Sequence, residues 1–160
     1  MIVVSDTSSL NALHKIGQIA LLPALYKQVL IPEQVRDEML RDSSMRNWLK
    51  NFPDWLMVKA IQDQSQYLNM LALMDEGEAE AIVLMIETKA DKLLIDDREG
   101  RSKAIELRLP VIGTLGVLLN AKQSGLLETI RPQVEALISV AKFRISPVLF
   151  DHVLTLAGEF

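Results

Sequence analysis

Short apolar runs alternate with longer amphipathic segments along most of the chain. The short runs are continuous and rich in Val, Ile and Leu, as in buried strands, and they fall at residues 2–4, 28–31, 92–95 and 109–112. Between them, apolar residues recur at helical spacing, most clearly in residues 10–16, 33–40, 75–89 and a segment ending at residue 108. Repeated strand, helix, strand order predicts an α/β fold, a three-layer α/β/α sandwich around a mostly parallel sheet.

The rest of the chain is less regular. Residues 41–69 hold most of the polar, loop-like composition, and within them residues 55–58 are expected to form a short strand. Two helical segments, residues 126–142 and 147–157, are expected to close the structure. Because the chain of 160 residues contains no linker, internal repeat or low-complexity run, it is expected to form a single domain over residues 1–160.

Composition excludes several classes of function. The net charge of −4 argues against a protein that coats nucleic acid or membranes by charge alone. The absence of cysteine excludes disulfides, thiolate catalysis and Cys-ligated zinc, and the two histidines have no metal-binding spacing. With no signal peptide pattern and no uncharged apolar run of about 18 residues, we expect no membrane association and a cytoplasmic location.

Acidic and hydroxyl residues directly follow the predicted strands. Asp6 ends the first strand, Asp96 and Asp97 end the third, and Thr114 follows the fourth, where it is expected to cap the next helix. In a parallel sheet the carboxyl ends of the strands meet at one edge, where ligands bind. Taken alone, Asp6 is equally well explained as a helix N-cap. The prediction of a site therefore depends on further acids reaching the same edge.

Two predicted helices bring such acids. Glu38 lies one turn after Val35, which must face the core, and so it borders the buried face. Glu78 shares a helix face with Ile82 and is the better candidate for an inward carboxylate, whereas Glu80 is expected to be solvated.

Carboxylates gathered in one crevice repel one another, by about 4 kcal/mol per pair at 4 Å and an effective dielectric near 20. They must take up protons or hold a cation. Oxygen ligands without Cys or His favour Mg²⁺ or Mn²⁺ over zinc or copper. Arg98 and Arg101, directly after Asp97, are candidates to hold a phosphate beside such an ion, although a solvated basic helix face explains them equally well.

The order of these motifs resembles that of the PIN-domain ribonucleases. The matching motifs are Asp6-Thr7-Ser8, Val35-x-x-Glu38, Gly77-Glu78-Ala79-Glu80-Ala81-Ile82, Leu94-Ile95-Asp96-Asp97-Arg98-Glu99-Gly100-Arg101 and Pro110-Val111-Ile112-Gly113-Thr114-Leu115-Gly116. Each is weak alone, but their order covers nearly the whole chain. The compact prokaryotic branch related to VapC toxins is especially similar.

The resemblance implies a Mg²⁺- or Mn²⁺-dependent endoribonuclease that acts on single-stranded or looped RNA, and, as a toxin, a cognate antitoxin partner and a homodimer. It makes Asp6, Glu38, Glu78 and Asp97 the metal-binding and catalytic acids, with Ser8 supporting the first of them. The sequence departs from the commoner family pattern in two places. These departures leave open whether Glu78 or Glu80, and whether Asp96 or Asp97, is the metal ligand. Because successive strand residues face opposite sides, only one of the two aspartates is expected to face the crevice fully, and Asp97 is chosen.

Other functions share this fold class. A degenerate PIN-like module that only binds RNA or a protein is the main alternative, and the presence of all four acids argues against it. A phosphoacceptor signalling domain would need paired acids after the first strand, where this chain has one. Dinucleotide- and ATP-binding glycine motifs are absent from the sequence.

Overall fold

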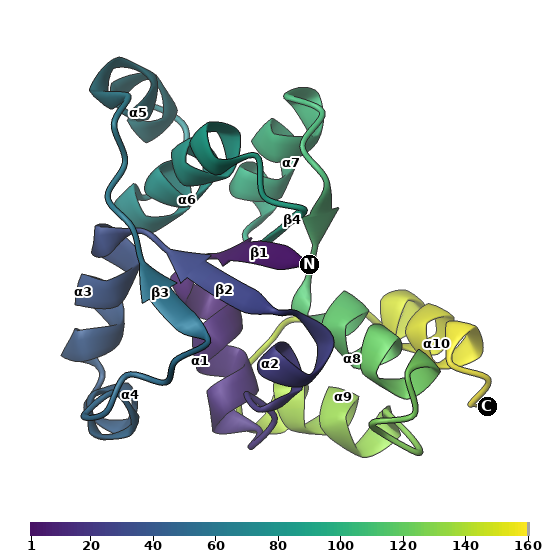
Figure 1. Ribbon diagram of the computed structural model, residues 1–160. Coiled ribbons are helices and arrows are strands. Elements are labelled where there is room, and N and C mark those ends of the chain that lie inside the picture. The colour runs from purple at the N-terminus through teal and green to yellow at the C-terminus, as the bar shows by residue number, and fades with distance from the viewer. Residues whose placement is uncertain (160) are drawn as a thin grey trace.

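Five parallel strands form the centre of the molecule (Figure 1). This computed structural model describes residues 1–159. The strands lie in the order β3-β2-β1-β4-β5, and their bounds are β1 Ile2–Ser5, β2 Gln28–Ile31, β3 Leu56–Val58, β4 Lys92–Leu94 and β5 Val111–Ile112. Each neighbouring pair is parallel, so all five carboxyl ends lie at one edge of the sheet. The predicted parallel sheet is confirmed.

Helices cover both faces of this sheet. They are α1 Thr7–Lys15, α2 Leu21–Leu25, α3 Glu33–Arg41, α4 Ser43–Trp48, α5 Gln64–Leu71, α6 Glu76–Thr88, α7 Arg98–Glu106, α8 Thr114–Gln123, α9 Arg131–Ser139 and α10 Pro147–Leu156. In Figure 1, α5, α6 and α7 lie on one side, with α1, α2 and α8 on the other. The predicted α/β/α sandwich is therefore confirmed.

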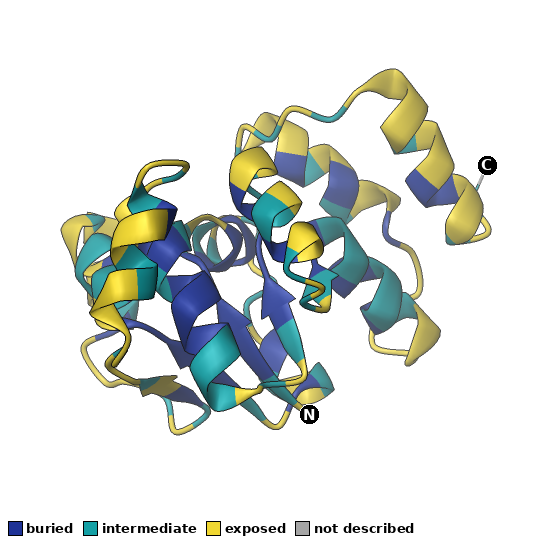
Figure 2. Cartoon of the chain, turned by 90° about the horizontal axis from the view of Figure 1, so that it is seen from above, coloured by how far each residue is buried: buried dark blue, intermediate teal, exposed yellow. Residues whose placement is uncertain are grey.

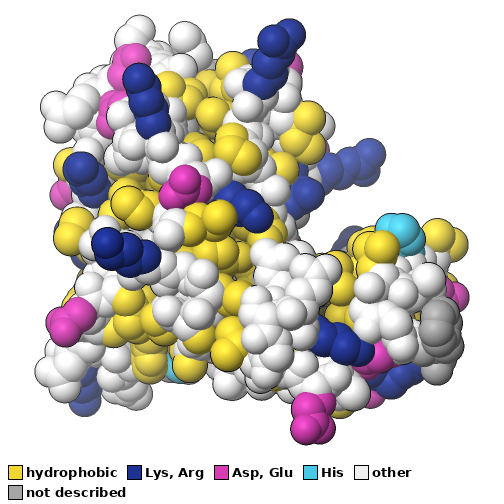
Figure 3. All heavy atoms as spheres, turned by 45° about the vertical axis from the view of Figure 1, so that its right-hand side comes forward, with side chains coloured by type: hydrophobic (Ala, Val, Ile, Leu, Met, Phe, Trp, Pro, Cys, Tyr) yellow, Lys and Arg dark blue, Asp and Glu magenta, His cyan; other side chains and the backbone are white. Residues whose placement is uncertain are grey.

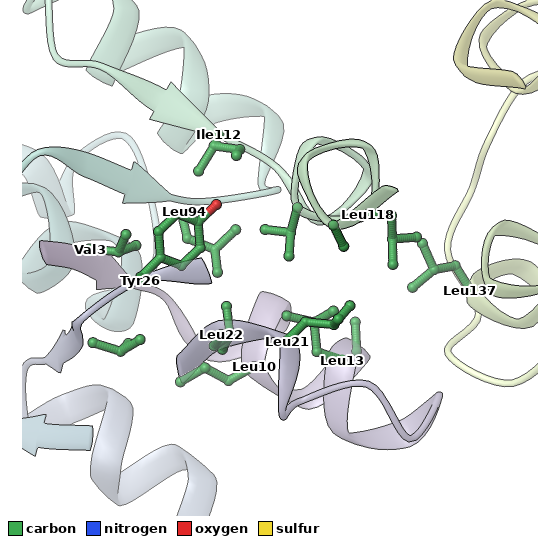
Figure 4. Packing of buried hydrophobic residues seen from close by; sticks show 14 of the residues in the cluster. Val3, Leu10, Leu13, Leu21, Leu22, Tyr26, Leu94, Ile112, Leu118 and Leu137 are labelled. Atoms are coloured by element: carbon green, nitrogen blue, oxygen red, sulfur yellow. The ribbon is translucent and has the colours of Figure 1, made fainter. Parts of the chain in front are cut away.

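Each face of the sheet has its own hydrophobic core. Val3 and Leu94 point into the core shared with α1, α2, α8 and α9, which Figure 4 shows. Their neighbours Val4 and Leu93 point into the core shared with α6. This alternation is the normal consequence of strand geometry, and it explains why the strands read as continuous apolar runs in the sequence.

Some helices differ from their predicted bounds. The helix expected over residues 126–142 is only α9, which starts at Arg131 because Pro132 favours the first helical turn, and which is preceded by a turn at Gly125 with a φ of +78°. Two short helices, α4 and α5, were not predicted. Their signals were Asp42 and Asp63, whose side chains accept hydrogen bonds from the first backbone N–H groups of each helix.

The C-terminal arm, residues 140–159, projects from the sandwich (Figure 2). Only Val153 and Leu154 of α10 are buried, and the rest of the helix is mostly exposed. Glu159 fixes the end of the arm by accepting hydrogen bonds from the backbone N–H of Ile130 at 2.8 Å and from Lys122 Nζ at 2.9 Å. Among the residues described, no helix is long and apolar enough to cross a membrane.

Candidate active site

Asp6 occupies the turn between β1 and α1 and is only 1% exposed. Its Oδ1 accepts the backbone N–H of Ser9 at 3.0 Å, which caps α1, and its Oδ2 accepts that of Asp96 at 3.4 Å. Burial, followed by the negative charge of Asp96, raises the pKa of Asp6 to about 7, against the lowering effect of these hydrogen bonds. Asp6 therefore caps α1, and its surroundings also disfavour the charged form of its carboxyl group.

Asp96 is the most extensively hydrogen-bonded acid of the site. Its carboxylate accepts Ser9 Oγ at 2.6 Å, the backbone N–H of Thr114 at 2.9 Å and Thr114 Oγ1 at 2.5 Å. The prediction that Thr114 caps α8 is wrong: Gly113 is the N-cap, and Thr114 is the first residue of the helix. The hydroxyl of Thr114 is used to hold Asp96 instead, across the ends of β4 and β5.

Asp97 caps α7 by accepting the backbone N–H of Gly100 at 2.9 Å. Both Asp97 and Asp96 are half-buried and line the same pocket. Strand alternation does not apply to them, because β4 ends at Leu94, so the choice of Asp97 over Asp96 stays a prediction.

Glu38 lies where α3, α1 and α6 meet. Thr7 Oγ1 donates a short hydrogen bond to Glu38 Oε2, and Gln34 Nε2 donates to Oε1 at 3.4 Å. A Cβ atom at Gly77 would lie only 2.6 Å from Glu38 Oε2, so α6 approaches this closely only because residue 77 is glycine. The inward face predicted for Glu38 agrees with these contacts.

Glu78 and Glu80 lie in different electrostatic surroundings. Burial raises the pKa of Glu78 to about 6, and the charges of Asp97, Asp75 and Glu38 add to the shift, while the backbone N–H of Glu78 itself opposes it. Burial also raises the pKa of Glu80, but its nearby charges belong to Glu33, Asp37 and Glu76, and it accepts the backbone N–H of Gln34 at 3.4 Å. The expectation that Glu80 is solvated is wrong, because it is half-buried and hydrogen-bonded to Gln34. Asp97 and Glu38 act on the pKa of Glu78 and not on that of Glu80.

Gly77→Ala is expected to displace Glu38 without unfolding the protein. The new methyl group would overlap the end of a flexible side chain, which can turn away, and alanine favours the helix by up to about 1 kcal/mol. We expect unchanged or slightly higher stability in urea unfolding, together with at least a roughly tenfold loss of any activity that depends on these acids. Equal activity in Gly77→Ala and wild type would show that the position of Glu38 is unimportant.

The acids of this edge are not neutralised by neighbouring cations. None of the ion pairs found in residues 1–159 includes Asp6, Glu38, Glu78, Asp96 or Asp97. In the same part of the chain, no group of three or more His, Asp or Glu side chains converges closely enough to hold a metal ion. The charge that acts on Asp6 is that of Asp96, whereas those that act on Glu78 are the charges of Asp97, Asp75 and Glu38.

The three predicted substrate-binding residues differ in position. Arg98 is exposed. Arg101 is half-buried, and its Nη1 donates to the carbonyl oxygen of Ile95 at 3.0 Å, which holds the guanidinium beside the acidic edge. Ser8 is exposed and lines the same pocket as Arg101, but the residue that contacts Asp6 is Ser9.

This pocket has a volume of about 840 Å³ and lies between the sheet edge and the C-terminal arm. Its wall on the sandwich side includes Asp96, Asp97 and Arg101, and its wall on the arm side includes Phe143 and Leu149. Figure 3 shows the molecule hollowed between its main body and the arm, with hydrophobic side chains gathered along the hollow. The acidic edge is thus open to a ligand from this side.

Sequence reasoning missed the hydroxyl residues that hold the acids. Thr7 contacts Glu38, while Ser9 and Thr114 contact Asp96. The first two lie in the polar cluster after β1, where a site role was predicted for Asp6 and Ser8 but not for Thr7 or Ser9. Their signal was the number of hydroxyls in that cluster, which exceeds what one cap requires.

A comparison with protein families shows which family the chain resembles. A family model described as a PIN domain matches residues 2–159, which is nearly the whole chain. No curated protein and no solved structure matches it. PIN domains are in general nucleases, and an acidic edge on a parallel sheet agrees with that activity. The chain belongs to the PIN-domain family.

Proposed function

We propose that this protein is a divalent-metal-dependent endoribonuclease that hydrolyses phosphodiester bonds of single-stranded RNA. The observation that carries the proposal is a set of acids without ion-pair partners in the described part of the chain, Asp6 and Asp97 after β1 and β4 and Glu38 and Glu78 on α3 and α6. Two of them, Asp6 and Glu78, have pKa values raised to about 7 and about 6, mainly by burial. Such a site gains free energy when a cation replaces the protons.

The chemistry of the donor set fits Mg²⁺ or Mn²⁺. The edge offers carboxylate oxygens only, with hydroxyls behind them, and these hard ligands match hard divalent ions. Binding would require the acids to come closer together than they do in this structure, and Glu38 and Glu78 are the two half-buried glutamates that would have to move. A bound ion would supply positive charge to the phosphate and lower the pKa of an attacking water.

The residues of the chain have separate roles in this proposal. Asp6, Glu38, Glu78 and Asp97 would hold the ion, and Thr7 positions Glu38 through its hydrogen bond. The guanidinium of Arg101 lies beside the same pocket and forms no ion pair with a carboxylate in residues 1–159, so it can bind a phosphate oxygen.

We further propose that the protein is the toxin of a toxin-antitoxin pair, with a homodimeric toxin and an antitoxin that covers the acidic edge. The support is the resemblance of the whole motif series to the VapC branch of PIN domains. Co-purification of this chain with the product of an adjacent small gene, and loss of RNA cleavage in that complex, would support the role. A toxin whose cleavage is unchanged in the complex would contradict it.

Glu78→Gln and Glu80→Gln form a matched pair of variants that tests whether the protein is a nuclease. Both acids lie on α6, both are half-buried, and only Glu78 is close to Asp97 and Glu38. With labelled single-stranded RNA and Mn²⁺, we expect wild type and Glu80→Gln to cleave, and Glu78→Gln to be at least roughly 100-fold slower. EDTA should stop all cleavage.

A binding module without catalysis is the alternative. It predicts that wild type binds RNA or a protein but cleaves nothing at any Mn²⁺ or Mg²⁺ concentration. Cleavage that is equal in wild type and Glu78→Gln would point to a contaminating nuclease, and it would also contradict the enzyme proposal.

A further inference from the structure

The pocket between the acidic edge and the C-terminal arm has a graded charge. On the sandwich side it is lined by Asp96, Asp97 and Arg101, and on the arm side by Lys142 and Arg144. None of these three cations forms an ion pair with a carboxylate in the described residues, although the protein as a whole carries a net charge of −4. Cations collected next to acids in an acidic protein indicate an anionic ligand that spans both ends.

Most of the other side chains that line the pocket are apolar. They include Ile112 and Leu115 from the sandwich and Phe143, Ile145 and Leu149 from the arm. The volume of about 840 Å³ lies in the range of about 300–1,000 Å³ that is typical of small-ligand pockets. A ligand that fits must therefore carry a flat or apolar part together with negative charge.

The arm residues of the pocket are held in place by the backbone. The N–H of Phe143 donates to the carbonyl oxygen of Leu137 at 2.8 Å, and Lys142 Nζ donates to that of Ser139 at 2.9 Å, which ties the segment to α9. Lys142 adopts a left-handed φ of +61°, the turn that brings the following residues over the pocket. Phe143 stands between Lys142 and Arg144 in sequence, and all three line the pocket. An aromatic side chain in a positively charged groove is the combination that binds unpaired nucleotides.

We propose that this pocket is a subsite for single-stranded RNA next to the cleaved bond, which rests on the function proposed above. One unstacked base packs against Phe143 and its apolar neighbours. The adjoining phosphates contact Arg101 and Arg144, with Lys142 beside them. The subsite would require bases to leave their stack, so it selects single-stranded or looped RNA over duplex RNA.

The test measures binding, so that it does not depend on cleavage. Fluorescence anisotropy with a labelled ten-nucleotide single-stranded RNA in EDTA would compare wild type, Arg144→Ala and Phe143→Leu, where leucine keeps the packing volume. Lys50→Ala is the matched control, because Lys50 is also exposed but lies outside this pocket. We expect Phe143→Leu to bind about fivefold more weakly or worse, and the control to bind like wild type.

Salt dependence gives a second readout for Arg144. Each phosphate contact to a single strand contributes about 0.7 to the slope of log affinity against log salt concentration, so Arg144→Ala should lower the slope by about 0.7. Duplex RNA of the same length should bind more weakly to wild type and should be insensitive to Phe143→Leu.

The outcomes separate this subsite from the proposed nuclease. If wild type cleaves RNA but Arg144→Ala and Phe143→Leu bind it as wild type does, the subsite is wrong and the nuclease stands. If RNA binds through these residues without being cleaved, only the nuclease is wrong. If the two substitutions weaken only the binding of a co-purifying protein, the pocket is a protein-docking site and the RNA subsite is wrong.

Discussion

Asp6→Asn is expected to remove RNA cleavage while making the metal-free protein more stable at pH 8. The asparagine amide keeps the cap on Ser9 but carries no charge to bind a cation. Because burial raises the pKa of Asp6 from 3.8 to about 7, ionising the buried carboxyl costs up to about 4 kcal/mol of folding free energy. Urea unfolding in EDTA at pH 8 measures the gain, and cleavage of single-stranded RNA measures the loss, expected to exceed roughly 100-fold.

The pH dependence of the folding stability follows from the raised pKa of Asp6. Below about pH 4, Asp6 is protonated in both the folded and unfolded protein and costs nothing. As the pH rises through 7, the unfolded chain loses this proton first, so the stability present at low pH is lost. We expect Asp6→Asn to flatten that fall, whereas Asp54→Asn, at an exposed aspartate, should leave it unchanged. If stability falls as steeply with pH in Asp6→Asn as in wild type, the raised pKa of Asp6 is not the cause of the fall.

Mn²⁺ is expected to produce the second large effect, an increase in Tm at pH 8. A ligand at 100 times its Kd adds about 2.7 kcal/mol to the stability of the folded state, which corresponds to roughly 5–10 °C for a chain of this size. At pH 5, Asp6 and Glu78 are mainly protonated, so the ion must displace protons and the increase should be much smaller. Differential scanning fluorimetry at the two pH values measures both.

The control for the increase in Tm with Mn²⁺ is the variant that lacks the Asp6 carboxylate. Asp6→Asn should show little increase in Tm with Mn²⁺ at pH 8, while Asp54→Asn should behave like wild type. An increase of the same size at pH 5 and pH 8, or in Asp6→Asn, would place the ion elsewhere on the acidic surface.

The strands and the acids that follow them could be predicted because both depend on local sequence. A continuous apolar run such as residues 92–95 has to be buried on both faces, and the residue after it has to lie at the sheet edge. The positions of Asp6 and of the Asp96–Asp97 pair follow from that rule, but the rule does not choose between the two aspartates. Helical spacing was sufficient to place Glu38 and Glu78 on inward faces, since Val35 and Ile82 had to be buried.

What could not be predicted depends on contacts between distant segments. Asp96 is held by Ser9 and Thr114, which are 87 and 18 residues away in sequence, so nothing local distinguishes its role from that of Asp97. The same applies to position 77, where glycine is required only because Glu38 lies so close to it. The pocket was not expected either, because its second wall belongs to a segment with no recognisable motif.

A crystal structure of the protein with Mn²⁺, solved with the anomalous signal of the metal, tests the central claim most directly. The expected result is a manganese peak at the carboxyl ends of β1 and β4, with oxygen ligands from Asp6 and Asp97 and with Glu38 and Glu78 turned toward it. A structure with no peak at this edge at saturating Mn²⁺, or with the ion held by Glu80 and its neighbours instead, would contradict it.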